Sequence, residues 1–472
     1  MPPRGRNPIG PWSAWCLYTV VLITGVARGG MWLDELQVWC LARDSGSLPH
    51  LFHLLRNEGH PPLWPVLVKG LTLITDRPAA MAVLHSLFAC GTAWLLLFRA
   101  PWPFAWRVLA VAGYFVLFEY AVIARNYGPA MFLLFAGIAA RTAGRPAWAT
   151  ACVMGMAFLH YWGIVAAGAY AVMLLPGRNT AERTAAILCA AGAITALWWA
   201  LPTEALPYQP ALDRIVPAEL PSALGRLLGQ VFLPFPDPSN PRPWNTSWLL
   251  DHAPLLHGWL GAACFATALW SVGNRRSALL FFLLTTLGIL VFPLLAPFRS
   301  IRYVGPILLA FLAALWMDPP RARVKRAAVV VLLALQVPAA LFMTVVGWHT
   351  PRSQASTSVK LLRNSPYAEL PVVVHPYQLS PAVSAYLGRP VYCPATDTMG
   401  SYCRWTHHPF RLEADSLPIA LQRMPYRTAI LICDDATLEL RAHSGSDISS
   451  VAHPGPALIT SEEHHIYLIR KP

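Results

Sequence analysis

The stretch Trp32-Leu33-Asp34-Glu35 follows directly on an apolar run over residues 12–29 that is long enough to cross a membrane. A carboxylate costs free energy near a bilayer, so an acidic pair at the membrane face indicates a function. Two arginines precede the apolar run, and the positive-inside rule then predicts a cytoplasmic start of the chain. Asp34 and Glu35 are therefore expected on the outer face of the membrane.

The composition indicates a polytopic membrane protein. Of the 472 residues, 56% are hydrophobic and only 12% are charged, whereas soluble chains carry roughly 25% charged residues. The net charge of +13 comes from short basic clusters between apolar runs, and no single basic stripe is formed. We therefore interpret the basic residues as topology signals and expect membrane lipids, and no nucleic acid, as partners.

The apolar runs predict about eleven transmembrane helices when each is compared with the roughly 20 residues that cross a bilayer. They lie at residues 12–29, 79–98, 104–123, 128–141, 147–160, 162–176, 184–201, 253–272, 278–297, 301–317 and 326–347. This number places every arginine-rich connector in the cytoplasm. We expect a multi-pass protein of the inner (plasma) membrane, with a cytoplasmic N-terminus and an extracytoplasmic C-terminal domain.

Two domains are expected, a transmembrane domain over residues 1–347 and a small α/β domain over residues 348–472. In the first, the outer loop 30–78 carries the acidic pair and two interfacial helices, at residues 34–42 and 61–74. The outer loop 202–252 contains an amphipathic stretch that could rest on the membrane, at residues 220–231. In the second, patterns predict strands at 371–375, 391–393, 428–433 and 466–470, and helices at 359–363 and 381–387.

Two cysteines of this tail, Cys393 and Cys403, lie ten residues apart. In an oxidising compartment they could form a disulfide, and two unrelated thiols are an equal alternative.

Five motifs along the chain resemble those of the GT-C superfamily of integral membrane glycosyltransferases. The resemblance is greatest to the branch of the dolichyl-phosphate-mannose protein mannosyltransferases and the bacterial aminoarabinose and galacturonosyl transferases, and it covers residues 12–317. In order, the motifs are Trp32-Leu33-Asp34-Glu35, His60-Pro61-Pro62-Leu63, Ala124-Arg125-Asn126-Tyr127, His160-Tyr161 and Arg302-Tyr303-Val304-Gly305-Pro306.

This resemblance implies a GT-C-like fold and an inverting transfer at the outer face. The donor would be a sugar carried on a polyprenyl phosphate, and the acceptor an envelope lipid, glycan or protein. Asp34 corresponds to the general base that is proposed for the family. Some relatives carry a lysine close to the position of His60, so a phosphate contact there would pass to His60 or Lys69.

The chemistry of transfer agrees with these residue types. One carboxylate must accept the proton of the acceptor, and cationic donors must hold the phosphate leaving group. We therefore expect Asp34 and Glu35 to be catalytic. In the alternative, Asp34 caps the following helix and Glu35 occupies its first turn.

Arginines on the outer side contradict the usual charge bias of membrane proteins, and a guanidinium fork suits a phosphate. Arg125, Arg299 and Arg302 have this placement, with snorkelling to lipid headgroups as the alternative. For Glu119, an ion pair with Arg125 and a direct role are equally expected. The expected substrate-binding residues are His60, Lys69, Arg125, Tyr127, His160, Arg299, Arg302 and Tyr303.

No cofactor and no metal ligand set are expected. Asp34 and Glu35 could hold a divalent cation, but a cage needs more hard ligands than two. The alternative function is a non-catalytic transporter or flippase for a lipid-linked sugar. A transporter would place ionisable groups near the midplane and often shows inverted repeats, and this sequence shows neither.

Overall fold

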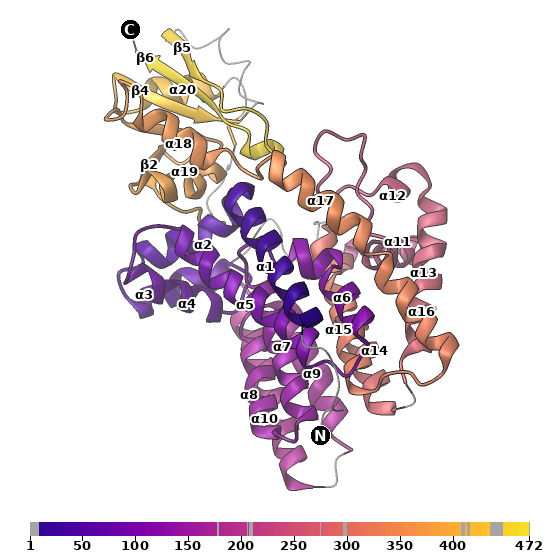
Figure 1. Ribbon diagram of the computed structural model, residues 1–472. Helices are drawn as coiled ribbons and strands as arrows, with labels where there is room; N and C mark the ends of the chain where they lie inside the picture. The colour runs from indigo at the N-terminus through magenta and orange to yellow at the C-terminus, as the bar shows by residue number, and fades with distance from the viewer. Residues whose placement is uncertain are drawn as a thin grey trace.

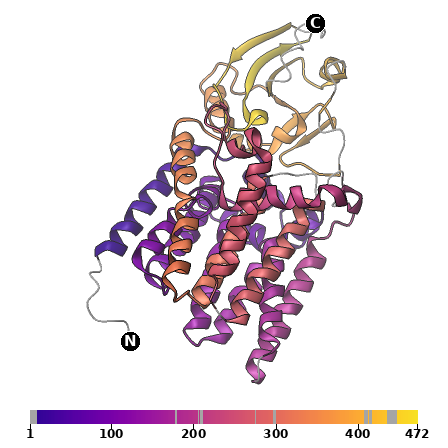
Figure 2. The ribbon, with the colours of Figure 1, turned by 90° about the vertical axis from the view of Figure 1, so that its right-hand side faces the viewer.

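The computed structural model of the chain describes residues 9–471 except 177–178, 205, 207–210, 274, 296–299, 407–410, 413–415 and 435–446. A helical body occupies most of the chain, and a mixed α/β domain lies at one end of it (Figures 1 and 2). Each predicted span coincides with one helix or with two consecutive helical segments.

The helices of the body are mostly apolar, and five stretches are long and apolar enough to cross a membrane. These are α1 (Ile9–Gly29), α5 (Ala79–Phe98), α10 (Thr180–Ala200), α14 (Arg276–Leu295) and the continuous stretch Arg323–His349, which contains α16 (Arg323–Ala334) and α17 (Val337–His349). The other segments are α6 (Phe104–Val111), π-helical η2 (Phe115–Glu119), α7 (Tyr127–Thr142), α8 (Pro146–Ala157), α9 (Tyr161–Leu174), α13 (Pro254–Ser271), η5 (Ile301–Tyr303) and α15 (Pro306–Met317). The number of eleven membrane crossings stays a prediction.

The core of the body surrounds α15. Every residue of this helix from Pro306 to Trp316 is buried, which agrees with a sequence that is apolar on all sides. The outer helices instead expose large apolar side chains, such as Ile187, Ile194 and Leu287. Such surfaces are expected where the solvent is lipid.

Short helices of the segment 30–78, which the sequence predicts to be the first outer loop, lie together beneath the α/β domain (Figure 1). They are α2 (Leu33–Asp44), α3 (Leu48–Leu54), η1 (Leu55–Asn57) and α4 (Leu63–Thr72). The helices expected at 34–42 and 61–74 are α2 and α4, whereas α3 was not predicted.

The second outer loop contains η3 (Leu212–Arg214), η4 (Pro217–Glu219), α11 (Leu220–Phe232) and α12 (Trp248–His252). The amphipathic stretch 220–231 is the helix α11, and it packs along α13. The two backbones approach so closely that a Cβ at Gly261 would lie 2.3 Å from the backbone nitrogen of Gly229. Glycine is therefore required at this crossing.

The α/β domain contains a six-stranded mixed sheet in the order β3-β2-β1-β4-β6-β5. Strand β1 is parallel to β2 and β4, and the other pairs are antiparallel. Its elements are α18 (Ala355–Arg363), β1 (Val372–His375), η6 (Tyr377–Leu379), α19 (Ser380–Leu387), β2 (Val391–Cys393), β3 (Thr398–Gly400), α20 (Ser416–Arg423), β4 (Thr428–Cys433), β5 (Asp447–Ala452), η8 (Thr460–Glu462) and β6 (His465–Arg470).

All four predicted strands and both predicted helices of this domain are present, and β3, β5 and α20 were not predicted. Cys393 and Cys403 are buried free thiols, so the alternative of two separate thiols holds. The Cys393 sulfur lies 3.0 Å from the hydroxyl oxygen of Ser380.

Candidate active site

Two arginines converge on the carboxylate of Asp34, which lies in the first turn of α2. Nη1 of Arg125 and Nη2 of Arg302 both contact Oδ2 of Asp34, the latter at 3.1 Å. The exposed fractions of the three side chains are 20% for Asp34, 14% for Arg125 and 12% for Arg302. One partly buried carboxylate thus faces two guanidinium groups, and the excess positive charge favours a further anion.

Aromatic residues fix Arg302 in this position. The hydroxyl of Tyr120 donates to the carbonyl oxygen of Arg302 at 2.6 Å, and that of Tyr161 donates to the carbonyl oxygen of Tyr303 at 2.8 Å. The guanidinium carbon lies 5.3 Å from the ring centre of Trp32 and 5.5 Å from that of Tyr303, which are cation–π distances. The arginine is therefore held from three places, the residue directly after η2, the start of α9 and the chain before α2.

Imidazole and phenol rings complete the Asp34 cluster, which consists of Asp34, Arg125, Arg302, His60, His160 and Tyr127. Nε2 of His60 lies 3.3 Å from Nη2 of Arg125, and the His60 ring lies 5.2 Å from the ring of His160. The His160 ring in turn lies 4.0 Å from the ring of Tyr127. Burial and the charge of Arg125 lower the pKa of His60 to about 3. A neutral imidazole can accept the hydrogen bond of Arg125.

Several polar atoms of this cluster are buried without a hydrogen-bond partner among the described residues. They are Nε and Nη1 of Arg302, the hydroxyl of Tyr127, Nδ1 of His60 and Nε2 of His160. Buried polar groups are nearly always hydrogen-bonded, and exceptions gather where a ligand is bound. Donors predominate here, which again indicates an anionic ligand.

Glu35 lies beside Asp34 in sequence but has different partners. Its carboxylate is 1% exposed and accepts from the backbone N–H of Trp32 at 3.2 Å and of Ala124 at 2.6 Å. It also lies 3.7 Å from Nη2 of Arg352. Burial raises the pKa of Glu35, while Arg352 opposes the rise. Glu35 therefore takes the capping role that the alternative gave to Asp34, and it anchors the chain just before Arg125.

Lys69 is not brought into the cluster. Lys69 is buried in α4, and within the described part of the chain no ion pair or side-chain hydrogen bond joins its ammonium group to the cluster. Arg299 lies outside the described residues. Asp34 and Glu35 engage different partners, because Asp34 faces Arg125 and Arg302 while Glu35 faces Arg352 and two backbone N–H groups.

Glu119 is not the partner of Arg125, which pairs with Asp34 instead. Glu119 is 2% exposed, and its carboxylate accepts from the hydroxyl of Tyr114 at 3.1 Å and from the indole of Trp244 at 3.0 Å. The sequence interpretation missed Trp244 and Arg352, because neither lies near a motif. A signal was available for Arg352, a basic residue directly after the last apolar run.

The comparisons with known proteins identify the fold. No family model matches this chain, and no curated protein matches it. The crystal structure of ArnT from Cupriavidus metallidurans bound to undecaprenyl phosphate has a TM-score of 0.54 and 14% sequence identity, and the match covers 98% of this chain and 98% of that chain. Its apo state gives a TM-score of 0.53 and 15% identity over the same shares.

The chain has the ArnT fold. This likeness confirms the fold that the resemblance in the motifs implied. The match includes the α/β domain, since it covers 98% of both chains. The motif resemblance ended at residue 317, and the shared fold therefore extends further than the motifs indicated.

Proposed function

We propose that this chain is an inverting glycosyltransferase that moves a sugar from a polyprenyl-phosphate donor to an acceptor at the outer face of the plasma membrane. The observation that carries the proposal is the convergence of Arg125 and Arg302 on Asp34, among buried polar atoms that lack partners. The ArnT structure, bound to undecaprenyl phosphate, supports the choice of lipid carrier.

The phosphate of the donor would compete with Asp34 for the two guanidinium groups. Arginine binds phosphate through parallel N–H bonds, and two buried nitrogen atoms of Arg302 have no partner among the residues that the structure describes. The Tyr127 hydroxyl and the ring nitrogens of His60 and His160 can hydrogen-bond the phosphate or the sugar. Binding of the donor would release the Asp34 carboxylate for proton transfer.

The transfer is then a single displacement at the anomeric carbon. The oxygen or nitrogen of the acceptor forms a bond to this carbon, and its proton passes to Asp34. The bond between the anomeric carbon and the phosphate oxygen breaks, and the electron pair leaves with the polyprenyl phosphate. Arg125 and Arg302 stabilise the charge that develops on this leaving group. Attack from the opposite face inverts the configuration.

Replacement of Asp34 by Asn tests the proposal in the full chain in lipid nanodiscs with a polyprenyl-phosphate sugar. We expect release of polyprenyl phosphate to fall by about 10²–10⁴-fold, the usual contribution of a positioned general base. Binding of undecaprenyl phosphate should be kept, because a competing anion is removed from the arginines. The matched control is Asp447→Asn, at an exposed carboxylate of the α/β domain.

Release at the wild-type rate by the Asp34→Asn variant would contradict the role of this residue. Movement of a labelled donor across the bilayer, without cleavage of its phosphate ester, would instead support the transporter alternative.

A further inference from the structure

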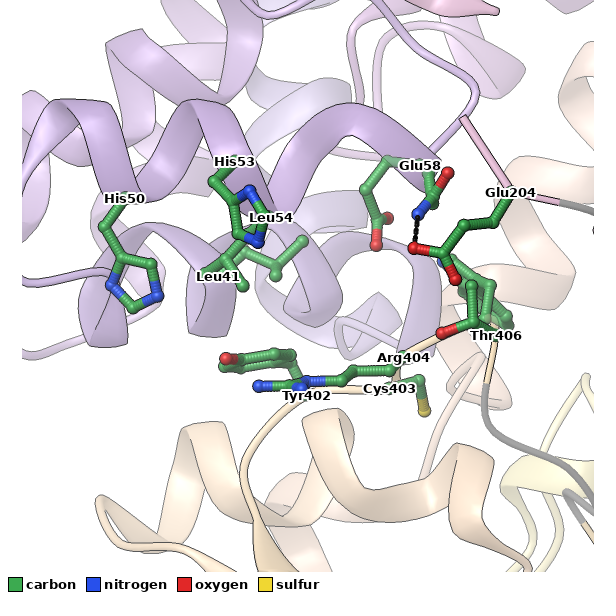
Figure 3. A pocket seen from close by; sticks show the side chains of 12 residues that line it. Leu41, His50, His53, Leu54, Glu58, Glu204, Tyr402, Cys403, Arg404 and Thr406 are labelled. Carbon is green, nitrogen blue, oxygen red and sulfur yellow. Dashed lines mark hydrogen bonds between the residues drawn. The ribbon is translucent and has the colours of Figure 1, made fainter. Parts of the chain in front are cut away.

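A pocket of about 240 Å³ lies between the first outer loop and the α/β domain (Figure 3). The loop side contributes His53 and Glu58, and the facing side contributes the segment 402–406 of the α/β domain. Glu204, from the chain after α10, closes one end beside Glu58 (Figure 3). The mechanism above uses none of these residues.

Hydrogen bonds hold the floor of this pocket in place. The amide of Gln37 donates to the carbonyl oxygen of Cys403 at 2.8 Å and accepts from the N–H of Cys403 at 2.9 Å. The N–H of Arg404 donates to the hydroxyl of Tyr377 at 3.0 Å. Gln37 also donates to Glu58 at 3.0 Å, so one side chain fixes both walls. The pocket is therefore a built feature of the domain interface.

The end that carries Glu204 is fixed in the same way. The amide nitrogen of Asn57 donates to Glu204 at 3.2 Å, and its oxygen accepts from the N–H of Thr203 at 3.0 Å. Asn57 thus connects η1 to the chain after α10. Figure 3 shows Glu58 and Glu204 at the same end of the pocket, with Thr406 facing them.

Glu58 connects the pocket with the Asp34 cluster. It lies two residues before His60, whose ring contacts Arg125. Burial raises the pKa of Glu58 to about 7, opposed by hydrogen bonds from Trp405 and Gln37 and by the charge of Arg125, while the charge of Asp34 adds to the rise. Gln37, whose amide contacts Glu58, lies three residues after Asp34 in α2. A group bound in the pocket would therefore lie about one helical turn from the residue that is proposed as the base.

The lining has the chemistry of a sugar site. The rings of Tyr402 and Trp405 offer apolar faces for the C–H side of a pyranose, and the carboxyl groups of Glu58 and Glu204 can accept from its hydroxyls. The volume lies below the roughly 300–1,000 Å³ of sites for drug-sized ligands, so one ring is accommodated. Above a pH of about 7, where Glu58 is ionised, two carboxylates line the pocket with one guanidinium, that of Arg404, beside the imidazoles of His50 and His53, and the two carboxylates disfavour a phosphate.

We propose that this pocket binds the acceptor of the transfer, and that the acceptor presents an uncharged sugar ring there. This inference rests on the proposed function, because an acceptor is needed only if a donor is used. The acceptor hydroxyl would point past Glu58 toward Asp34. A phosphorylated sugar and a peptide are the competing occupants that the binding experiment tests.

Saturation-transfer difference NMR on the full chain in nanodiscs tests the pocket. The probes are glucose, galactose, mannose and N-acetylglucosamine, each with its 6-phosphate, and a Ser/Thr-containing hexapeptide. We expect at least one neutral sugar to bind, and its phosphate to bind at least about tenfold more weakly. Trp405→Ala should weaken the binding of the neutral sugar by about tenfold, through loss of the aromatic face.

A second variant, Glu204→Gln, keeps the shape of the pocket and removes a charge. We expect this variant to reduce the difference in binding affinity between the neutral sugar and its 6-phosphate. Glu369→Gln makes the same change at an exposed carboxylate of the same domain and should leave both affinities as they are. If the phosphate or the peptide binds as well as every neutral sugar, or no sugar binds, the pocket assignment is overturned.

Undecaprenyl phosphate binding, measured on the same samples, separates this inference from the proposed function. Lipid binding without sugar binding overturns the pocket assignment alone. If the unmodified chain does not bind undecaprenyl phosphate, the proposed function itself is overturned.

Discussion

At the scale of single residues, the pairing of Asp34 sets an order of events. Oδ2 of Asp34 is occupied by Arg125 and Arg302 when no donor is bound. A phosphate that takes over these two guanidinium groups frees this oxygen to accept a proton. If the proposed function is correct, donor binding should therefore precede proton transfer from the acceptor, and acceptor that binds before the donor should not react.

The arginines can be tested separately by replacing each with Lys. Lys keeps the charge but loses the planar fork, so binding of undecaprenyl phosphate should weaken by about 1–3 kcal/mol per lost charge-assisted contact. Arg302→Lys should have the larger effect, because stacking over Trp32 and Tyr303 is also lost. Binding to the purified protein in detergent measures both variants.

Arg323→Lys is the matched control for these variants, at an exposed position before the last apolar stretch. Unchanged lipid affinity in both site variants, as in this control, would remove Arg125 and Arg302 from the phosphate site. A thermal melt of each protein checks that the fold is kept.

At the scale of elements, the α/β domain supports the first turn of α2. The carboxylate of Glu462 accepts from the N–H of Leu33 at 2.8 Å and from the hydroxyl of Ser353 at 2.6 Å. Gly30 makes this contact possible, because its φ of +61° suits glycine and a Cβ there would lie 2.8 Å from the carbonyl oxygen of Ser353. The element that carries Asp34 is thus held from both domains.

This support predicts a pH dependence of stability. Burial raises the pKa of Glu462 to about 7, opposed by its hydrogen bonds from Ser353 and Leu33. A carboxyl whose pKa is raised by folding stabilises the folded state at low pH, and this contribution is lost as the pH rises from about 4.5 to about 7. Glu35 changes in the same direction, because burial raises its pKa as well.

We expect the melting temperature in detergent to fall as the pH is raised from about 5 to about 8. The loss of the Glu462 contribution should lower the free energy of unfolding by about 1–3 kcal/mol over this range. Glu462→Gln should flatten this part of the curve, and Glu369→Gln, at an exposed site, should not. A melting temperature that rises over this range in the unmodified protein, or the same fall in both variants, would contradict the role of Glu462.

Sequence patterns predicted those elements whose own residues are apolar. Strands β1 and β4 are almost completely buried and read as Val- and Ile-rich runs, so they were found at or near their bounds. Strand β5 is mostly polar and half exposed, and its pairing with β6 determines it. A strand that depends on its neighbour for hydrogen bonds leaves no periodic signal in its own residues.

The site divides in a similar way. Asp34, Arg125 and Arg302 were predicted because charges beside apolar runs are costly and so stand out. The contact between Trp244 and Glu119 joins residues 125 positions apart, and nothing in either neighbourhood indicates the other. Asp34 and Glu35 are neighbours in the first turn of α2 and point in different directions. Only the structure shows that the Asp34 side chain is the one that faces Arg125 and Arg302.

At the scale of the whole molecule, three parts meet at one end of the helical body (Figure 2). The body contributes Arg125 and Arg302, the first outer loop contributes Asp34, and the α/β domain contributes the floor of the pocket. All three must therefore face the same side of the membrane. A donor on a polyprenyl phosphate requires that this side be the outer one, which the arginine-rich connectors also predict.

Cysteine labelling in intact cells tests this orientation. Ser47 of the first outer loop, Glu369 of the α/β domain and Thr180 at the start of α10 are all exposed, whereas the nearby Ser45 is buried and unsuitable. With a membrane-impermeant maleimide, cysteines at positions 47 and 369 should react in intact cells. A cysteine at position 180 should react only after the membrane is opened, because it lies within a basic connector that is predicted to be cytoplasmic. The unmodified chain, in which Cys16 is exposed, gives the background.

The opposite labelling pattern would place Asp34 and the arginines in the cytoplasm. On that side of the membrane a lipid-carried donor has no advantage over a soluble nucleotide sugar. The proposed donor would then be wrong, even if the fold and the Asp34 cluster are correct.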